Sequence, residues 1–230
     1  NQIIDLPDGF SYTVVSRKGE PMNDGLRVPG AHDGMGAFEG KDGRVILVCN
    51  HELYSPQTSR GAFGDGYAVL PESFKTRLYD RGGDDTPNLG GTTTTIYNPA
   101  TLKTEHQFLS LCGTEFNCAG GTTPWGSWLT CEESFEDPGI AKTREGSEYF
   151  RDLRHGYVFE VPSSATELVP AVALKDMGRF EHEAAAVHPP TGIVYLTEDR
   201  WHSLFYRFIP NQPGQLSRGG RLQMLAVKDP

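Results

Sequence analysis

Residues 116–133, FNCAGGTTPWGSWLTCEE, combine Cys118 with a glycine-rich turn, two tryptophans and a pair of carboxylates. The adjacent glycines let the backbone approach a neighbouring segment or a ligand closely. Residues 127–131 favour a short strand that would present Glu132 and Glu133 at its end. A thiolate and carboxylates on one hairpin indicate a metal site. The alternative is a tight hairpin with a buried cysteine and a solvated acidic tip.

The composition limits the classes of partner. The chain has 230 residues and a net charge of −9, which makes nucleic acid or an anionic membrane surface an unsuitable partner. No apolar run approaches the roughly 18 residues that predict a membrane span. We therefore expect no nucleic acid partner and no membrane span.

The rest of the chain is rich in turn residues, and its 27 Gly and 16 Pro favour many short strands over helices. Residues 54–90 are interpreted as a long inserted loop on the functional face, with a helix expected only at 72–79. Repeated strand–turn–strand units predict an all-β fold built from propeller blades, with a β-sandwich as the alternative. Hydrophobic alternation and short apolar runs predict further strands at residues 10–16, 45–49, 91–97, 103–111, 156–161, 171–176, 183–188, 193–197, 204–209 and 222–227.

Five segments in sequence order carry a family resemblance. They are LPDGFSYTVVSRKGEPMNDG at 6–25, DGMGAF at 33–38, NHEL at 50–53, NCAGGTTPWGSWLTCEE at 117–133 and GRFEHEAAAVHPPTGIVYLTEDR at 178–200. Together they resemble the PhoX-type alkaline phosphatases and their uncharacterised relatives. The resemblance implies a β-propeller with calcium and iron in a central site, where one iron is bound by a cysteine. It also implies hydrolysis of phosphate monoesters and export to the periplasm or the exterior.

The length of the chain bears on this interpretation. At about 40–45 residues a blade, 230 residues would make about five blades, and the predicted strands make fewer. The chain ends at Pro230, directly after a predicted strand, and an open propeller would expose sheet edges. We therefore expect residues 1–230 to be one propeller domain with long inserted loops, incomplete in this chain. We expect the remainder to lie in a longer protein or a companion chain.

Several carboxylates are candidate metal ligands. Glu52 follows a predicted strand in NHEL, and Glu183 enters a buried strand, where a lone charge would need a partner. Glu198 lies at the end of the same predicted hairpin as Glu183, opposite its turn. With Glu132 and Cys118 they form the expected ligand set, Cys118 for iron and the acids for calcium, which prefers oxygen. A solvated strand end is the alternative for Glu52.

Two residues are candidates for substrate contact. Arg200 in TEDR could hold a phosphate through two parallel hydrogen bonds, or it could pair with Asp199. Asn117 precedes the candidate cysteine ligand. The sequence has neither a GxSxG elbow nor a nucleotide-binding GxxxxGK[ST] loop, so those chemistries are not indicated.

The expected function is metal-dependent hydrolysis of the phosphate monoester of a small molecule. One alternative is a non-catalytic propeller that calcium stabilises and that binds ligands. Another is a calcium-dependent lactonase or esterase, because a fold does not fix a function. Cys49, Cys112 and Cys131 leave room for at most one disulfide if Cys118 binds metal.

Overall fold

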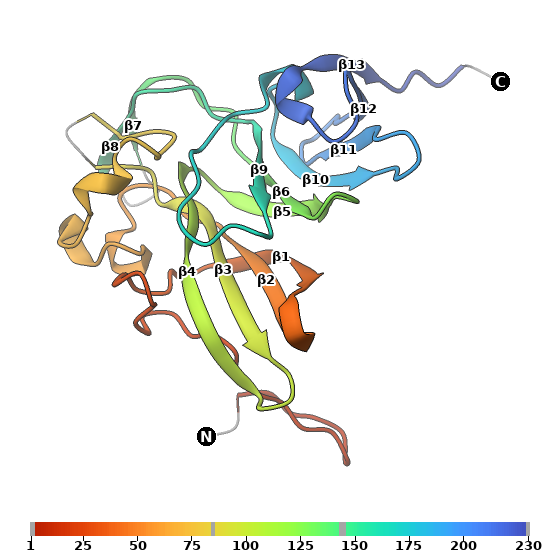
Figure 1. Cartoon of the computed structure of the whole chain (residues 1–230). Helices are drawn as coiled ribbons and strands as arrows, with labels where there is room; N and C mark the ends of the chain where they lie inside the picture. Colours follow the sequence, from red (N-terminus) through yellow and green to blue (C-terminus); the bar gives the residue numbers. More distant parts are fainter. Residues whose placement is uncertain (1–2, 84–85, 143–145, 229–230) are drawn as a thin grey trace.

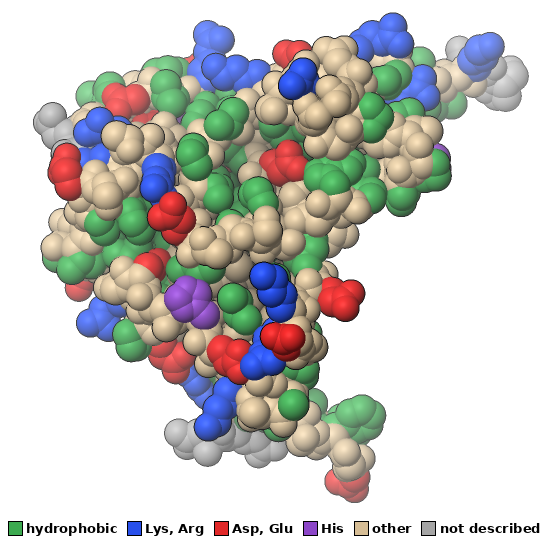
Figure 2. Space-filling model, in the orientation of Figure 1, with side chains coloured by type: hydrophobic (Ala, Val, Ile, Leu, Met, Phe, Trp, Pro, Cys, Tyr) green, Lys and Arg blue, Asp and Glu red, His purple; other side chains and the backbone are tan. Residues whose placement is uncertain are grey.

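The computed structural model describes residues 3–83, 86–142 and 146–228, and its ordered elements are strands and single turns of 3₁₀ helix. The expectation of an all-β chain is confirmed. Three sheets follow one another along the chain, and a small hairpin is inserted between strands of the second sheet, on the side away from the third sheet (Figure 1). In Figure 2, acidic and basic side chains are interspersed over the visible face. Within the described residues, no helix has the length and apolar character needed to cross a membrane.

The first sheet is an antiparallel four-stranded meander. Its strands are β1 (His32–Glu39), β2 (Val45–His51), β3 (Gly90–Asn98) and β4 (Lys103–Thr114). The β-branched run of threonines in β3 and the apolar run in β4 suit buried strands, and most of both is buried. The inserted loop predicted at 54–90 lies between β2 and β3 and packs Phe63 and Leu78 beside Leu109.

The second sheet carries the glycine-rich hairpin of residues 116–133. It contains β5 (Asn117–Thr122), β6 (Ser127–Glu132) and β9 (Val158–Pro162), with β6 in the centre. Every residue of β6 is buried, so the strand predicted at 127–131 is confirmed. Between β6 and β9 the chain forms the separate hairpin of β7 (Gly139–Lys142) and β8 (Glu148–Arg151).

The third sheet is again an antiparallel meander, formed by β10 (His182–Val187), β11 (Val194–Glu198), β12 (Phe205–Pro210) and β13 (Gly220–Met224). The hairpin predicted from 183–188 and 193–197 is confirmed by the pairing of β10 with β11. The short 3₁₀ helices are η1 (Lys41–Gly43), η2 (Thr58–Arg60), η3 (Asp65–Tyr67), η4 (Glu72–Phe74), η5 (Lys175–Met177) and η6 (Leu216–Arg218).

The first strands of the three sheets meet at β5, which packs against β1 on one side and β10 on the other. Glycine makes this approach possible. A Cβ atom at Gly121 would collide with the carbonyl oxygen of Ala185 on β10, and one at Gly34 would lie 2.9 Å from the carbonyl oxygen of Cys118. The sheets are therefore joined through backbone contacts around β5.

Three local predictions were wrong. Residues 10–16 form no strand: Phe10 is 72% exposed, and Thr104 and Gln107 of β4 reach Val15 and Ser16 through side-chain hydrogen bonds rather than a backbone ladder. Residues 171–176 form no strand either. The N–H of Leu174 donates to the carbonyl oxygen of Val158 on β9, but the chain enters η5 at the next residue, before a ladder can form. The predicted helix at 72–79 is reduced to η4. No sheet of the described residues closes on itself, and a closed propeller ring is not part of this structure.

Candidate metal centre

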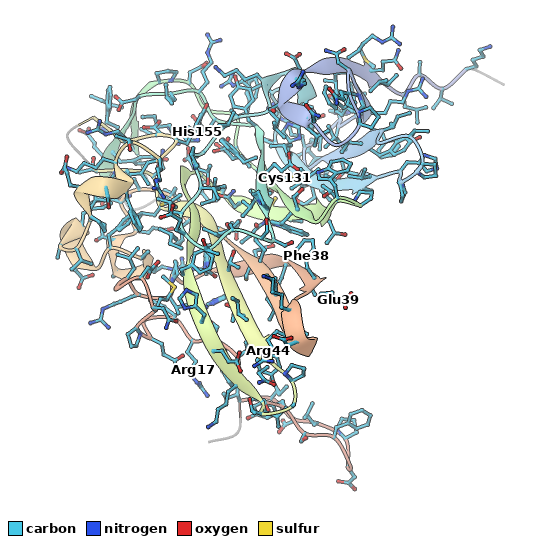
Figure 3. The ribbon with its side chains drawn as sticks, in the orientation of Figure 1. Arg17, Phe38, Glu39, Arg44, Cys131 and His155 are labelled. Carbon is cyan, nitrogen blue, oxygen red and sulfur yellow. The ribbon has the colours of Figure 1, made fainter. Side chains whose placement is uncertain are left out.

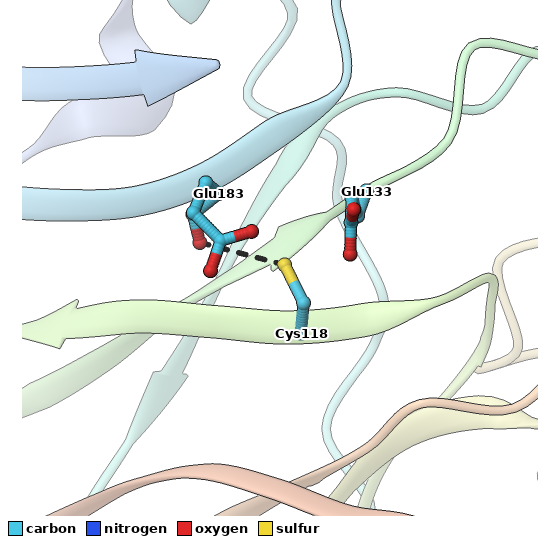
Figure 4. Close-up of side chains that lie close together, drawn as sticks. All are labelled: Cys118, Glu133 and Glu183. Atoms are coloured by element: carbon cyan, nitrogen blue, oxygen red, sulfur yellow. Dashed lines mark hydrogen bonds between the residues drawn. The ribbon is translucent and has the colours of Figure 1, made fainter. Parts of the chain in front are cut away.

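Three candidate metal donors converge where the first strands meet. Cys118 comes from β5, Glu133 follows the last residue of β6, and Glu183 comes from β10 (Figure 4). Their ligand atoms all lie within 4.8 Å of one another. The pairing of β5 with β6 places Asn117 opposite Glu132, so the next residue of each strand, Cys118 and Glu133, turns to the other side. Strand alternation therefore places Cys118 and Glu133, rather than Asn117 and Glu132, beside Glu183.

The backbone that carries Cys118 is held from β2. The side-chain amide of Asn50 donates to the carbonyl oxygens of Cys118 and Ala119, at 2.8 and 2.9 Å. The indole N–H of Trp128 donates to the amide oxygen of Asn50 at 2.8 Å, which fixes the orientation of that amide. Asn50 is fully buried. It positions the backbone that carries Cys118.

The sulfur of Cys118 faces β10. Its Sγ atom lies 3.3 Å from the carbonyl oxygen of His182 and 3.5 Å from that of Glu183, within reach of a thiol hydrogen bond. Only 4% of Cys118 is exposed. Burial, then the neighbouring Cys131 and Glu183, raise the pKa of this thiol well above its usual range. The thiol therefore stays protonated until a cation displaces the proton.

The pKa values of the two carboxyl groups, Glu133 and Glu183, are also raised. Burial, followed by the charges of Glu183, Asp199 and Glu52, raises the pKa of Glu133 to about 7. Burial is also the largest cause that raises the pKa of Glu183. These acids suppress one another's ionisation, and a bound cation would reverse that effect. The donor set of one thiol and two carboxyls therefore fits a metal ion.

More acids surround this group. Asp33 raises the pKa values of both Glu52 and Glu183, and Asp199 raises those of Glu133 and Glu183, so these charges lie within mutual influence. Asp33 belongs to β1, Glu52 follows β2 and Asp199 follows β11. Carboxylate oxygens in this number suit hard cations such as calcium. Glu52 therefore lies within electrostatic influence of the group, together with Asp33 and Asp199.

Comparisons with known proteins identify the family. The sequence model of the family described as alkaline phosphatase PhoX matches residues 1–230. The chain belongs to this family. A solved structure described as Pseudomonas fluorescens PhoX in complex with vanadate, a transition state analogue, is similar, with a TM-score of 0.63 at 17% identity. The match covers 96% of this chain and 52% of that one, so this chain spans about half its length. A search of curated proteins gives no match.

Membership of the PhoX family confirms the resemblance, but the structure places Glu132 differently from the prediction. Glu132 is fully buried and points away from Cys118. One of its oxygens accepts hydrogen bonds from the backbone N–H of Glu115 at 2.9 Å and from Nδ1 of His155 at 2.7 Å. The other oxygen accepts from the N–H groups of Gly156 and Tyr157. Glu133 occupies the place expected for Glu132 because successive residues of a strand face opposite sides.

His155, which is labelled in Figure 3, and Glu132 begin a buried charged network beside the second sheet. Burial alone would lower the pKa of His155, but the charge of Glu132 and hydrogen bonds to Asp80 and Glu132 raise it to about 10. His155 is therefore an imidazolium held between two carboxylates, with Nε2 3.1 Å from Asp80. Glu115 continues the network to Arg151 through bonds of 2.7 and 2.6 Å. This network stabilises the segment that carries Glu132 and Glu133.

The remaining predicted site residues lie outside the group of three. Glu198 accepts hydrogen bonds from the N–H of Leu204 and the hydroxyl of Tyr206, and so faces β12. Asn117 is fully buried and bonds Thr114 and Thr130 within its hairpin. Asp199 was the structural partner considered for Arg200. In the structure, Nε of Arg200 lies 3.3 Å from the carboxylate of Glu181 instead.

All four cysteines are free thiols. The disulfide left open for Cys49, Cys112 and Cys131 is therefore absent among these described residues.

Proposed function

We propose that this protein hydrolyses phosphate monoesters, with metal ions held by Cys118, Glu133 and Glu183. The observation that carries the proposal is the convergence of these three donors from three different strands to within 4.8 Å. Membership of the PhoX family supports a phosphatase rather than another hydrolase. The similar P. fluorescens structure binds vanadate, which its description calls a transition state analogue.

The donor chemistry suggests which ions would bind. The thiolate of Cys118 suits a transition metal, and we propose iron, because soft sulfur selects such metals over calcium. The carboxylates of Glu52, Glu133 and Glu183, with their acidic neighbours, suit calcium. When bound, such cations stabilise charge on the phosphoryl oxygens and on the leaving oxygen.

The protein's own side chains hold this arrangement and orient the substrate. Asn50 fixes the backbone of Cys118, and the network at His155 fixes the end of β6. Arg200 remains our candidate for phosphate binding. Its side chain is 49% exposed, so it can exchange its ion pair with Glu181 for a charged ester. Asn117 and Glu198 would act only through the segments they stabilise.

We also propose that the three sheets are blades of a propeller that further residues complete, in the same chain or in a companion chain. Support comes from the three meanders, whose first strands meet at β5. The third sheet also leaves Phe205, Met224 and Leu225 exposed, at 43%, 65% and 59%. A neighbouring blade would cover such apolar surface. By its family, we propose a periplasmic or secreted location.

The test is metal analysis together with activity on the purified protein. We expect iron and calcium, and turnover of a phosphate monoester that EDTA abolishes. Calcium without iron and without turnover would favour the calcium-stabilised binding module. Hydrolysis of a lactone but not of a phosphate ester would favour the lactonase.

A further inference from the structure

A cavity of about 580 Å³ lies against the candidate metal centre. Glu133 forms part of its wall, and the wall continues over the aromatic residues Tyr54, Phe116 and Tyr149. Pockets for small molecules commonly measure about 300–1,000 Å³ and combine apolar walls with a few polar groups. A molecule that is bound at Glu133 could therefore extend directly into this cavity.

The three rings form one row. The rings of Tyr54 and Phe116 are stacked with centroids 4.6 Å apart, and the centroid of Tyr149 lies 5.7 Å from that of Tyr54. Each ring is partly accessible. Aromatic faces in such a row favour a flat apolar or aromatic group over a strongly hydrated one.

The row is fixed relative to the metal donors. The N–H of Phe116 donates to the carbonyl oxygen of Leu53, and its own carbonyl oxygen accepts from the N–H of Glu133, both at 2.9 Å. Phe116 adopts a φ of +48°, which side chains other than glycine rarely adopt. Strained backbone that the surroundings enforce often marks a functional position. One hydrogen bond therefore links the aromatic row to Glu133.

The cations in the cavity wall already have partners. Arg151 bonds Glu115 and lies 3.5 Å from Glu136, and Lys142 lies 3.0 Å from Glu148. The described part of the wall also includes the acids Glu136, Asp137 and Glu181. A second phosphate group entering this cavity would meet acids and paired cations, and its desolvation would not be compensated.

We infer that this cavity binds the alcohol portion of the substrate and selects phosphate monoesters of ring-bearing alcohols that carry no second phosphate. The inference rests on the proposed phosphatase function and names the substrate class for that site. Tyr54 and Phe116 are specificity-determining residues, because they would contact the leaving group without contacting the reacting phosphorus.

The experiment compares benzyl phosphate with ethyl phosphate, using the protein with its full-length chain and bound metals. Both esters release an alkoxide, so the ring is the main difference between them. We expect kcat/KM to be higher for benzyl phosphate. Tyr54→Leu should lower kcat/KM for benzyl phosphate by about two- to tenfold, the value of one aromatic contact, and leave ethyl phosphate nearly unchanged. Phe116→Leu should lower kcat/KM for benzyl phosphate in the same way. If Tyr54→Leu does not fold, the comparison of the two esters is made with Phe116→Leu.

The matched control is Phe150→Leu. Phe150 lies on β8 but outside the cavity wall, so this variant should leave kcat/KM unchanged for both esters. Equal kcat/KM for the two esters, unaffected by either cavity variant, would overturn the inference while leaving the phosphatase proposal intact. Turnover of neither ester would instead contradict the phosphatase proposal. In that case calorimetric binding of benzylphosphonate and ethylphosphonate decides: tighter binding of the benzyl compound that Tyr54→Leu abolishes supports the cavity, and equal binding refutes it.

Discussion

The sulfur of Cys118 lies 3.5 Å from the backbone oxygen of Glu183, although the two residues are 65 positions apart in the sequence. The contact joins the first strand of the second sheet to the first strand of the third. It brings a thiol and a carboxyl group to one point, with Glu133 beside them.

Cys118→Ser should lose bound transition metal while the fold survives, because a hydroxyl oxygen replaces the soft sulfur donor. We expect iron affinity to fall by more than about tenfold, since even indirect metal partners contribute about 10–100-fold. Elemental analysis measures the loss, and far-UV circular dichroism reports the fold. Cys49→Ser, which alters a thiol outside the group of three, should keep its iron. Unchanged iron content in Cys118→Ser would exclude the ligand role.

Glu132→Gln and Glu133→Gln should change the stability of the metal-free protein differently, although the residues are neighbours. Glu133→Gln removes a metal donor and a repelling charge, so metal content should fall while the stability of the metal-free protein holds or rises. Glu132→Gln leaves the His155 imidazolium without its closest carboxylate, 2.7 Å away. Breaking a buried ion pair costs about 3–5 kcal/mol. Urea unfolding of the metal-free variants measures both effects, and similar stabilities would contradict the assignment.

Removal of metal should destabilise the protein. Without cations, burial and mutual repulsion raise the pKa values of Glu133, Glu183 and Glu52. A ligand that binds only the native state adds about 2.7 kcal/mol at a hundredfold excess over its dissociation constant. EDTA should therefore lower Tm by several degrees, and added calcium should restore it. If Tm stays constant after metal removal is verified by elemental analysis, the acids are solvated singly.

Asp80 should make the protein acid-sensitive. Burial raises the pKa of this carboxyl, but hydrogen bonds from His155 and from three backbone N–H groups outweigh burial and lower the pKa below its usual 3.8. Because the folded-state pKa is the lower one, the stabilisation is complete above pH 3.8 and is lost as the pH falls through the folded-state value. Asp80→Asn should cost about 1.5–3 kcal/mol at neutral pH, with the difference shrinking in acid. A difference independent of pH would show that Asp80 is not ionised.

Residues 1–230 alone should not reproduce the activity of a longer protein that contains them. The exposed apolar side chains of the third sheet need a covering surface, and Arg200 is already shared with Glu181. We expect poor solubility, or folding without turnover, from this segment expressed by itself. A cooperatively melting segment that cleaves a phosphate monoester at the rate of the longer protein would refute this prediction.

Strands with strong local patterns were predictable from the sequence, and the non-local features were not. The hairpin of β10 and β11 follows from two apolar runs around a Pro-Pro-Thr-Gly turn. By contrast, β1 contains HDGMGAFE, whose glycines weaken the strand signal, and it forms because β2 and β5 lie beside it. Residues 10–16 have the better pattern but form no backbone ladder with a neighbouring strand. Packing partners, rather than propensity, decided both cases.

The candidate site was predictable in part. Cys118 and Glu183 carry clear signals, a cysteine in a glycine turn and an acid entering an apolar strand. The choice between Glu132 and Glu133 depends on the register of β5 with β6, which a one-residue shift would reverse. Asn50 belongs to the NHEL segment, but its bond to the Cys118 carbonyl arises from the docking of two sheets. Positions set by strand register and sheet docking require the structure.

The distribution of donors over β5, β6 and β10 has a consequence for the order of folding. Each sheet is a run of sequence neighbours, so each can form from nearby pairings before the sheets meet. The three donors come together only when β10 reaches β5, so a metal that they hold would bind the assembled protein and not a single sheet. During refolding with iron present, an absorption band from a sulfur–iron bond at Cys118 should therefore appear after the β-sheet circular dichroism signal. The delay would measure when the sheets dock.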